Sequence, residues 1–342
     1  MGPLEFIYYL GYSFQKSRSL KNRKRLPCRV ISVGNLTVGG TGKTPAVMAV
    51  AKEAKRRGFL PCVLTRGYKG KAKGPLFISK GEGALLSAAE AGDEASLMAE
   101  RLKGVPIVKG ADRHEAGMFA LREMTSQPSA FNPQTFLFIL DDGFQHWKLH
   151  RDLDILLIDS SDPFGNGRLL PSGILREPLR EMRRADIIVL TRTRKEAGFD
   201  LARKDLESEI RRYNPDAPIF CGWHEPVGFR TLSGRDLPLD ILDGKPVFAF
   251  CGIGNPASFR STLAGIKAEV RGFRAFRDHH AYRRPEIGRI IEGAGRCGAD
   301  WIVTTEKDIM RLRDFDIAQN ILSLRIEFAV EKGFYDRLFM EA

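Results

Sequence analysis

The sequence lacks the features that mark several classes of protein. Its five cysteines lie far apart and none form a C-x-x-C pair, which argues against a disulfide framework or a structural zinc ribbon and is typical of a reducing cytosol. It contains no run of about 18 uncharged apolar residues, the length needed to cross a bilayer. No RNP-like, zinc-finger or helix-turn-helix signature occurs, so nucleic-acid binding would rest on charge alone. We therefore expect no nucleic-acid partner and infer no obligate protein partner.

Positive charge exceeds negative charge in this chain. The 342 residues include 54 Lys and Arg against 42 Asp and Glu, which gives a net charge of +12. A hydrophobic content of 43% is ordinary for a folded protein and excludes a largely disordered chain. At about 150 residues per domain, the length predicts two domains. We expect a two-domain protein whose partner is anionic.

A large share of this charge lies near the N-terminus. Residues 1–27 hold six basic side chains and one acid, Glu5, and so contribute +5 of the +12. Before the basic run, a helix would place four apolar or aromatic residues on one face: Leu4, Ile7, Tyr8 and Phe14. An apolar helix beside a basic run is typical of a segment that lies in a membrane interface. The alternative is a helix packed on its own domain followed by a solvated linker, and the residues alone leave both open.

Short apolar runs alternate with helical stretches along the rest of the chain. Continuous apolar runs indicate strands buried on both faces, as in a parallel sheet covered by helices. The expected strands lie at 28–35, 61–67, 105–110, 135–142, 152–159, 185–192, 246–254 and 300–308, and the expected helices at Pro45–Arg57, Glu94–Lys103, Asp112–Met124 and Leu201–Tyr213. This alternation predicts an α/β fold with a doubly wound, mostly parallel sheet. Because turn residues crowd positions 214–245, we expect a first domain at 26–222 and a smaller α/β domain at 223–342.

A glycine-rich loop follows the first expected strand and leads into a helix. It consists of Thr37, Val38, Gly39, Gly40, Thr41, Gly42, Lys43 and Thr44. The strict P-loop pattern needs glycine at position 37, so the match fails by one residue. The chemistry is retained, because glycines let backbone N–H groups wrap phosphates, Lys43 would reach the β- and γ-phosphates and Thr44 would ligate Mg²⁺. A turn that merely opens a helix is the alternative.

Two acidic residues, Asp141 and Asp142, end another buried strand. A P-loop protein carries a second magnesium carboxylate at such a position. One of the pair would hold the metal directly or through water, and the other would orient the metal or a nucleophile. An acidic turn at a strand end is the alternative, but the phosphate loop upstream favours the metal site.

The histidines and the remaining acids leave the catalytic base open. His146 and His150 are four residues apart, a spacing that could bind zinc on a helix, but no third ligand accompanies them. An enzyme that phosphorylates an alcohol needs a base or a hydrogen-bond acceptor for the hydroxyl. Asp93 in the segment AGDE has the position of a helix cap, and a structural role is the default for the loop residues His279 and His280.

Seven motifs together resemble one enzyme family. They are VISVGNLTVGGTGKTP, TRGYKG, AGDE, DDGFQH, FGNGRLLPSGILREP, RDHH and TEKD, and they occur over 28–310 in the order and approximate spacing of bacterial tetraacyldisaccharide 4′-kinases. The resemblance implies a P-loop kinase of two α/β domains that uses ATP and Mg²⁺. It would phosphorylate the 4′-hydroxyl of a tetraacylated glucosamine disaccharide 1-phosphate and give lipid IVA in lipid A biosynthesis. It also implies a peripheral enzyme at the cytoplasmic face of the bacterial inner membrane, with 1–25 as an amphipathic segment at this anionic surface.

The resemblance further implies roles for single residues. Asp93 would accept the hydroxyl proton with His279 as its partner, and Arg176 would neutralise charge on the transferring phosphoryl group. The implied metal ligands are Thr44, Asp141, Asp142 and Glu177, and the candidates for holding the sugar or its 1-phosphate are Arg66, Arg113, Gln145 and His146. Thr305–Asp308, the TEKD segment, is a candidate contact for the adenine. Two other classes stay open: a P-loop NTPase that hydrolyses ATP without phosphorylating a glycolipid, and a nucleotide-sensing regulator tethered by its basic N-terminus.

Overall fold

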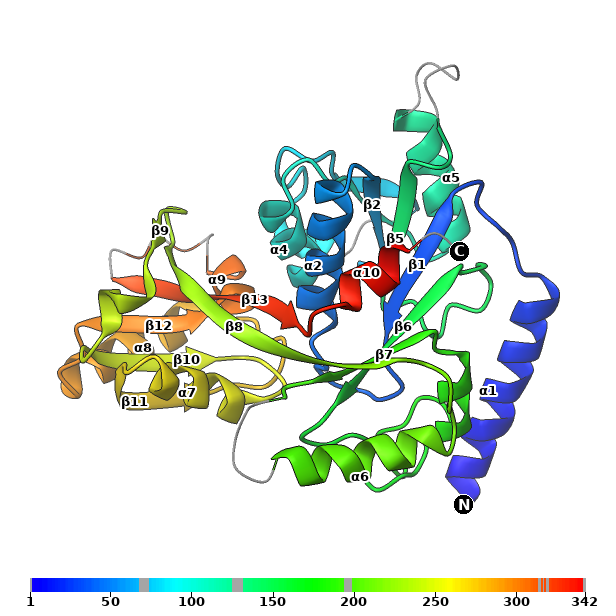
Figure 1. Ribbon diagram of the computed structural model, residues 1–342. Coiled ribbons are helices and arrows are strands. Elements are labelled where there is room, and N and C mark those ends of the chain that lie inside the picture. The colour runs from blue at the N-terminus through cyan, green and yellow to red at the C-terminus, as the bar shows by residue number, and fades with distance from the viewer. Residues whose placement is uncertain are drawn as a thin grey trace. The chain divides into compact units, whose positions relative to one another are not determined.

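Two compact units make up the chain, and the polypeptide passes between them twice. The computed structural model describes residues 2–67, 74–124, 132–193, 199–312, 315, 317 and 320–340. The first unit comprises Met1–Trp223 with Phe328–Ala342, and the second comprises His224–Glu327. The two passages lie within strands β8 (Ile219–Thr231) and β13 (Ile321–Val330), which Figure 1 labels. Residues 328–342, which the sequence assigns to the second domain, belong to the first unit because helix α10 (Phe334–Phe339) buries Phe334 and Leu338 in its core.

A parallel sheet forms the centre of the first unit. Its strand order is β7-β6-β1-β5-β2-β4-β3, with the start of β8 beside β7, and the pairing is parallel except between β3 and β4. The strands are β1 (Arg29–Gly34), β2 (Leu60–Thr65), β3 (Leu76–Ser79), β4 (Ile107–Lys109), β5 (Phe136–Asp141), β6 (Leu153–Asp159) and β7 (Ile187–Thr191). In register, Val33 of β1 lies beside Asp141 of β5, so the first strand and the acidic pair end together.

Helices cover both faces of this sheet. One face packs against α2 (Lys43–Arg56), α4 (Asp93–Arg101) and α10. The other packs against α5 (Arg113–Met124) and α6 (Phe199–Arg211). Successive side chains of β5 point to opposite faces of the sheet. Leu137 and Ile139 pack on the face covered by α2, and Phe138 and Leu140 pack on the face covered by α5. The expected α/β fold with a mostly parallel sheet is confirmed, and the expected elements differ from the observed ones by a few residues at their ends.

The second unit has its own sheet, in which β11, β10, β12 and β13 pair in parallel. The order is β11-β10-β12-β13 followed by the later part of β8, with the short β9 (Asp236–Leu237) antiparallel to β8. Here β10 is Pro246–Cys251, β11 is Glu269–Ala275 and β12 is Trp301–Thr305; the helices are α7 (Pro256–Gly265), α8 (Arg284–Arg296) and α9 (Glu306–Met310). The stretch 214–245, expected to be rich in turns, contains the 13-residue strand β8. Pro226 and Gly228 lie inside that strand, so the pairing of β8 with its neighbouring strands overrides the preference of these two residues for turns.

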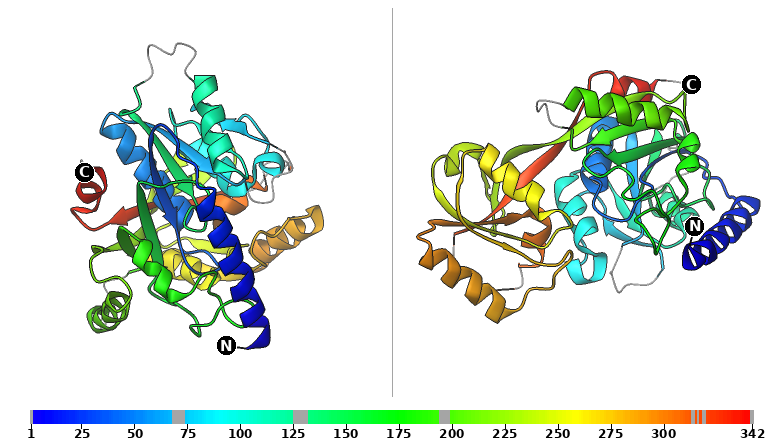
Figure 2. Two further views of the ribbon diagram at one scale, coloured as in Figure 1. Left: turned by 90° about the vertical axis from the view of Figure 1, so that its right-hand side faces the viewer. Right: turned by 90° about the horizontal axis from the view of Figure 1, so that it is seen from below.

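The N-terminal helix α1 (Pro3–Lys21) lies along the outside of the first unit (Figures 1 and 2). It buries the polar residues Glu5, Tyr12 and Ser19, whereas Ile7 and Phe14 are 64% and 70% exposed. Tyr8, expected on the apolar face, is half-buried and donates a hydrogen bond to the Arg176 carbonyl at 3.0 Å. Within the described ranges, no helix has the length and apolar character needed to cross a membrane.

Candidate active site

The phosphate loop joins the end of β1 to the N-terminus of α2. Gly39 and Gly42 have φ values of 116° and 85°, in the left-handed region that favours glycine, and Gly42 is the cap of the helix. Two hydrogen bonds connect the loop to residues outside it. The Val38 N–H donates to the Ile174 carbonyl at 2.8 Å, and the Thr191 hydroxyl donates to the Thr41 carbonyl at 3.1 Å. The loop is therefore held open at a helix N-terminus, where backbone N–H groups and the helix dipole favour a phosphate.

Asn35 lies directly after β1, and its side chain holds this loop in place through hydrogen bonds. Its side-chain amide donates to the Thr37 carbonyl at 3.0 Å and to the Thr37 hydroxyl at 3.1 Å. Its Oδ1 accepts from Lys43 Nζ at 3.2 Å and from the Arg176 guanidinium. Asn35 is fully buried, so it fixes the position from which both cations reach toward the loop. The sequence did not single out Asn35, because its signal, a polar residue between a strand and a glycine-rich loop, is common to many turns.

The acidic pair at the end of β5 divides into two different environments. Asp141 accepts a hydrogen bond from the Thr65 hydroxyl at 2.9 Å and is buried. Burial and the nearby charges of Glu94 and Asp142 raise the pKa of Asp141 to about 6. Asp142 has a left-handed φ of 52° and accepts two hydrogen bonds from Arg176, each of 2.9 Å. Although burial opposes it, the Lys43 ammonium at 3.8 Å and Arg176 lower the pKa of Asp142 to about 2.

The donor set fits a P-loop magnesium site rather than a site built only from protein ligands. No cluster of three or more His, Cys, Asp and Glu residues suited to a metal ion occurs in the described part of the chain, and His146 with His150 forms none. A nucleotide-bound magnesium needs fewer protein ligands, because phosphate and water oxygens complete its shell. Thr44 lies in the first turn of α2 next to Lys43, which contacts Asp142. The hydroxyl of buried Thr41 has no partner among the described residues, as expected of a loop shaped for a polar ligand.

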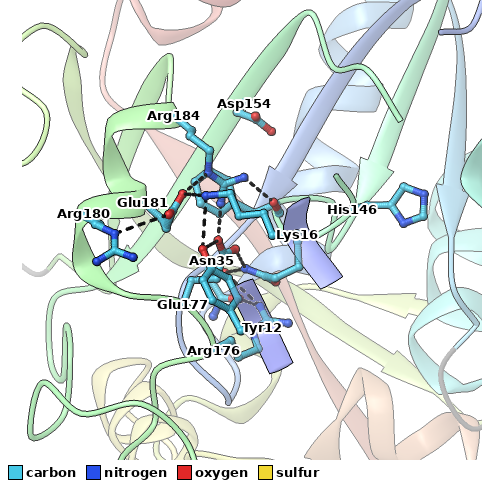
Figure 3. Close-up of polar contacts among 12 residues, drawn as sticks. Tyr12, Lys16, Asn35, His146, Asp154, Arg176, Glu177, Arg180, Glu181 and Arg184 are labelled. Atoms are coloured by element: carbon cyan, nitrogen blue, oxygen red, sulfur yellow. Dashed lines mark hydrogen bonds and ion pairs between the residues drawn. The ribbon is translucent and has the colours of Figure 1, made fainter. Parts of the chain in front are cut away.

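Glu177 is fully buried and lies in a network of polar side chains (Figure 3). Gln145 Nε2 donates to one of its carboxylate oxygens at 2.6 Å, and Arg184 Nη2 donates to the other at 2.6 Å. Tyr12 of α1 adds a longer hydrogen bond of 3.4 Å. Burial raises the pKa of Glu177, which shows that its charge depends on these partners. Since both oxygens are engaged by protein donors, the expected metal role of Glu177 gains no support from these contacts.

Asp93 and Glu94 are the first residues of helix α4, which covers the same face of the sheet as α2. Gly92, with φ of 94°, is the cap, so the expectation that Asp93 caps the helix is wrong by one residue. Glycine occupies the cap because that backbone conformation is strained for a side chain. Glu94 lies close enough to raise the pKa of Asp141. The sequence missed Glu94, although a second acid beside Asp93 is a visible signal.

Of the four residues expected at the substrate, Arg113 contacts the acidic pair, and Gln145 and His146 follow the pair in the chain. Arg113 is buried and donates to the Asp141 carbonyl at 3.4 Å. Gln145 donates to the Asn35 carbonyl at 2.9 Å as well as to Glu177. His146 Nε2 is buried without a partner among the described residues, and burial and Arg113 lower the pKa of His146 to about 4. Arg66 is exposed after β2, and Tyr68, Lys69 and Gly70 of the TRGYKG motif lie outside the described residues.

The remaining expected residue, His279, belongs to the second unit. It lies in the loop after β11 with a left-handed φ of 60°, and its N–H donates to the Gly252 carbonyl at 3.1 Å. Arg311 donates to its Nδ1 at 3.3 Å. His280 instead stacks on Phe276 and contacts Glu286 Oε2 through Nε2 at 3.1 Å. The two neighbouring histidines therefore have different partners.

A strand, a phosphate loop and a helix, with carboxylates at the end of the adjacent parallel strand, define a nucleotide-binding protein of the P-loop class. A sequence profile of the tetraacyldisaccharide-1-P 4′-kinase family matches residues 1–341. The chain belongs to this family, as its resemblance in motifs predicts.

Individual relatives agree with the family profile. A tetraacyldisaccharide 4′-kinase of Syntrophus aciditrophicus is 42% identical over 93% of this chain and 85% of its own length. One of Aquifex aeolicus is 37% identical over 96% of this chain and 94% of its own length. The crystal structure of LpxK from Aquifex aeolicus in complex with ATP matches with a TM-score of 0.75 and 36% identity, over 98% of this chain and 96% of that one.

Proposed function

We propose that the phosphate loop and the Asp142–Arg176 pair carry the family's activity, the ATP-dependent phosphorylation of a tetraacyldisaccharide 1-phosphate at its 4′-hydroxyl in lipid A biosynthesis. The observation that carries the proposal is the convergence of Lys43 and Arg176 on Asn35 and Asp142 beside a helix N-terminus. Phosphoryl transfer is catalysed mainly by positioning and by neutralising charge, and two fixed cations at a phosphate loop supply both.

The nucleotide would be held by the loop from Thr37 to Thr44. Its N–H groups would cradle the phosphates, and Lys43 would contact the β- and γ-phosphates. Burial lowers the pKa of Lys43, so its ammonium depends on anionic neighbours such as Asp142. The magnesium ligands would be the Thr44 hydroxyl and one carboxylate of Asp141 and Asp142. When bound, magnesium would neutralise charge on the phosphate oxygens.

The acceptor hydroxyl would be positioned by Asp93, with His279 as the partner of that carboxylate. An ionised carboxylate can accept the hydroxyl hydrogen bond and take the proton as the hydroxyl oxygen bonds to the γ-phosphorus and the bond from that phosphorus to ADP breaks. Arg66, Arg113, Gln145 and His146 would hold the sugar or its 1-phosphate. For His146, the lowered pKa means a neutral ring at pH 7, which would contact the acceptor as a hydrogen-bonding group rather than as a cation.

Helix α1 would bring the enzyme to an anionic membrane surface at the cytoplasmic face of the inner membrane. Ile7 and Phe14 present apolar surface, and Arg18, Lys21 and Lys24 are exposed basic residues at or beyond the end of the helix. Lys16 does not add to this exposed charge, because it forms an ion pair with buried Glu181. Apolar insertion combined with basic attraction is the usual basis of peripheral binding.

One assay tests the activity against its alternatives. The protein is incubated with ATP labelled in the γ-phosphate and with the tetraacyl disaccharide 1-phosphate, and the lipid is examined for label. We expect labelled lipid, its loss in K43M, and its retention in the matched control K52M on the same helix. Release of labelled phosphate without labelled lipid would identify an NTPase of another kind, and nucleotide binding without turnover would identify a regulator.

A further inference from the structure

The guanidinium of Arg311 connects His279 to the rest of the second unit. Arg311 follows α9, and its Nη2 lies 3.3 Å from His279 Nδ1. Its Nη1 donates to Asp308 Oδ1 at 3.1 Å and to the His280 carbonyl at 3.4 Å. Because its side chain is only 8% exposed, Arg311 is a fixed element between α9 and the histidine loop.

Asp308 holds this arginine in turn. It is fully buried, and its Oδ1 accepts from the Tyr282 hydroxyl at 3.0 Å as well as from Arg311. Its Oδ2 accepts from the Gly252 N–H at 3.0 Å and from the Thr305 hydroxyl at 2.7 Å. Each carboxylate oxygen therefore has two donors, which ties together the loops that follow β10, β11 and β12. The expectation that this segment contacts the adenine gains no support, because the Asp308 carboxylate is directed into the unit's own loops.

The chemistry of arginine determines what the histidine ring does. A guanidinium carries only donors, so the ring nitrogen that faces it must accept. His279 Nδ1 is therefore the acceptor, and in the neutral ring the hydrogen lies on Nε2. Nε2 faces the other way, with Asp278 Oδ1 at 4.0 Å. The His279 backbone is held in its left-handed conformation by the bond from its N–H to the Gly252 carbonyl, and Gly252 is itself bonded to Asp308.

We infer that Asp308 and Arg311 are positioning residues for His279, which they fix as the Nε2–H tautomer, so that Nε2 carries the hydrogen of the neutral ring. The inference rests on the proposed function, in which His279 is the partner of the Asp93 carboxylate. A carboxylate can only accept, so an Nε2–H donor is the tautomer that such a partner needs. This assigns a physical role to the TEKD segment: Thr305 and Asp308 set the position of Arg311, and Arg311 sets the ring.

Nuclear magnetic resonance on the full-length protein tests the tautomer directly. Long-range ¹H–¹⁵N spectra of protein labelled at histidine distinguish a bare Nδ1 from a protonated one, and the H279N variant assigns the signal. We expect the Nε2–H pattern for His279 in the wild type and a mixture of tautomers in R311M. The pattern of His280, which contacts Glu286 instead, serves as an internal control and stays unchanged. An Nδ1–H pattern in the wild type would overturn the inference whatever the variants do.

Kinetics separates this inference from the proposed role of His279. We expect R311M to lower kcat on the order of tenfold or more while KM for ATP changes little, and R311K to recover part of the loss. The exposed R271M of the same unit is the matched control, and circular dichroism establishes that each variant is folded at the assay temperature. A loss of turnover in R311M with an unchanged His279 tautomer would overturn the positioning role and leave the proposed function intact. Wild-type turnover in H279A would instead overturn the role of His279 in the proposed function.

Discussion

Arg176 donates two hydrogen bonds of 2.9 Å to the two carboxylate oxygens of Asp142. The same guanidinium reaches the Asn35 carbonyl at 3.1 Å, and the ammonium of Lys43 lies 3.8 Å from Asp142. Paired hydrogen bonds fix both the direction and the plane of a guanidinium. Arg176 is thus aimed before any ligand arrives, and reorganisation during phosphoryl transfer costs little.

Replacing Arg176 by lysine tests this preorganisation. A lysine ammonium is a point charge that cannot reproduce the planar pair of bonds to Asp142 while reaching Asn35. We expect R176K to lower kcat about 100-fold, since removing one preorganised donor has effects of that order. Steady-state kinetics on detergent-dispersed substrate measures the change. The control is R180K, in which the altered residue contacts the partly buried Tyr9, and equal turnover of the two variants would contradict the role of Arg176.

The stability of the ligand-free protein depends on pH through Asp141. Its pKa is raised from 3.8 to about 6, so the folded state disfavours its ionised form. Stability from this group is present below pH 3.8 and is lost as the pH rises through 6. Asparagine keeps the Thr65 hydrogen bond without the charge, so we expect D141N to raise the free energy of unfolding by about 3 kcal/mol at pH 7.5 and to change it little at pH 3.5. Urea unfolding at the two pH values measures both.

Asp142 is the control, because its ionised form stabilises the fold whereas that of Asp141 destabilises it. The pKa of Asp142 is lowered to about 2, so its contribution is present above pH 3.8 and is lost as the pH falls toward 2. Its side chain is 38% exposed, and solvent screening reduces the effect. We expect D142N to lower the free energy of unfolding by about 1 kcal/mol at pH 7.5. A stabilised D142N or a destabilised D141N at that pH would show that the two environments are assigned in reverse.

Much of the first unit's fold follows from its sequence, because its strands are continuous apolar runs and its helices begin at clear signals. Strand β5 and the helix after the phosphate loop were expected within two residues of their bounds. By contrast, β8 and β13 were missed, since long strands with partly exposed faces carry no continuous apolar run. The return of α10 to the first core was missed for another reason: its partners, such as Val47, are far away in the sequence.

The sequence motifs predict which residues form the site, but they do not predict the surroundings of each residue. The loop, Asp141 and Asp142 follow from pattern and order along the chain. The contrast between the two aspartates does not, because it depends on Glu94, Lys43 and Arg176, which arrive from other elements. The network around Glu177 was also invisible, since Tyr12 lies 165 residues away in the sequence.

The buried network predicts that Glu177 serves stability rather than metal binding. E177Q leaves Arg184 with Glu181 as its remaining carboxylate partner in a buried setting. We expect the free energy of unfolding to fall by about 2 kcal/mol, because a buried ion pair is broken while Glu181 still compensates part of the Arg184 charge. The Mg²⁺ concentration for half-maximal activity should stay unchanged. E53Q, which alters an ion-paired glutamate on helix α2, should cost less than about 1 kcal/mol. An increased Mg²⁺ requirement with unchanged stability would instead make Glu177 a metal ligand.

Substitutions on the two faces of helix α1 test membrane binding and stability separately. Ile7 and Phe14 are largely exposed, so the double variant I7S/F14S should leave the free energy of unfolding unchanged while weakening binding to anionic vesicles at least about tenfold. Added salt should weaken vesicle binding of the wild type as well, because it screens the exposed basic residues. The matched variant Y12F removes the hydroxyl that donates to Glu177, and it should lower stability without changing vesicle binding. Deleting the whole helix would confuse the two effects, because it also exposes Glu177 and Glu181. Unchanged vesicle binding in I7S/F14S would show that α1 is only a structural part of the first unit.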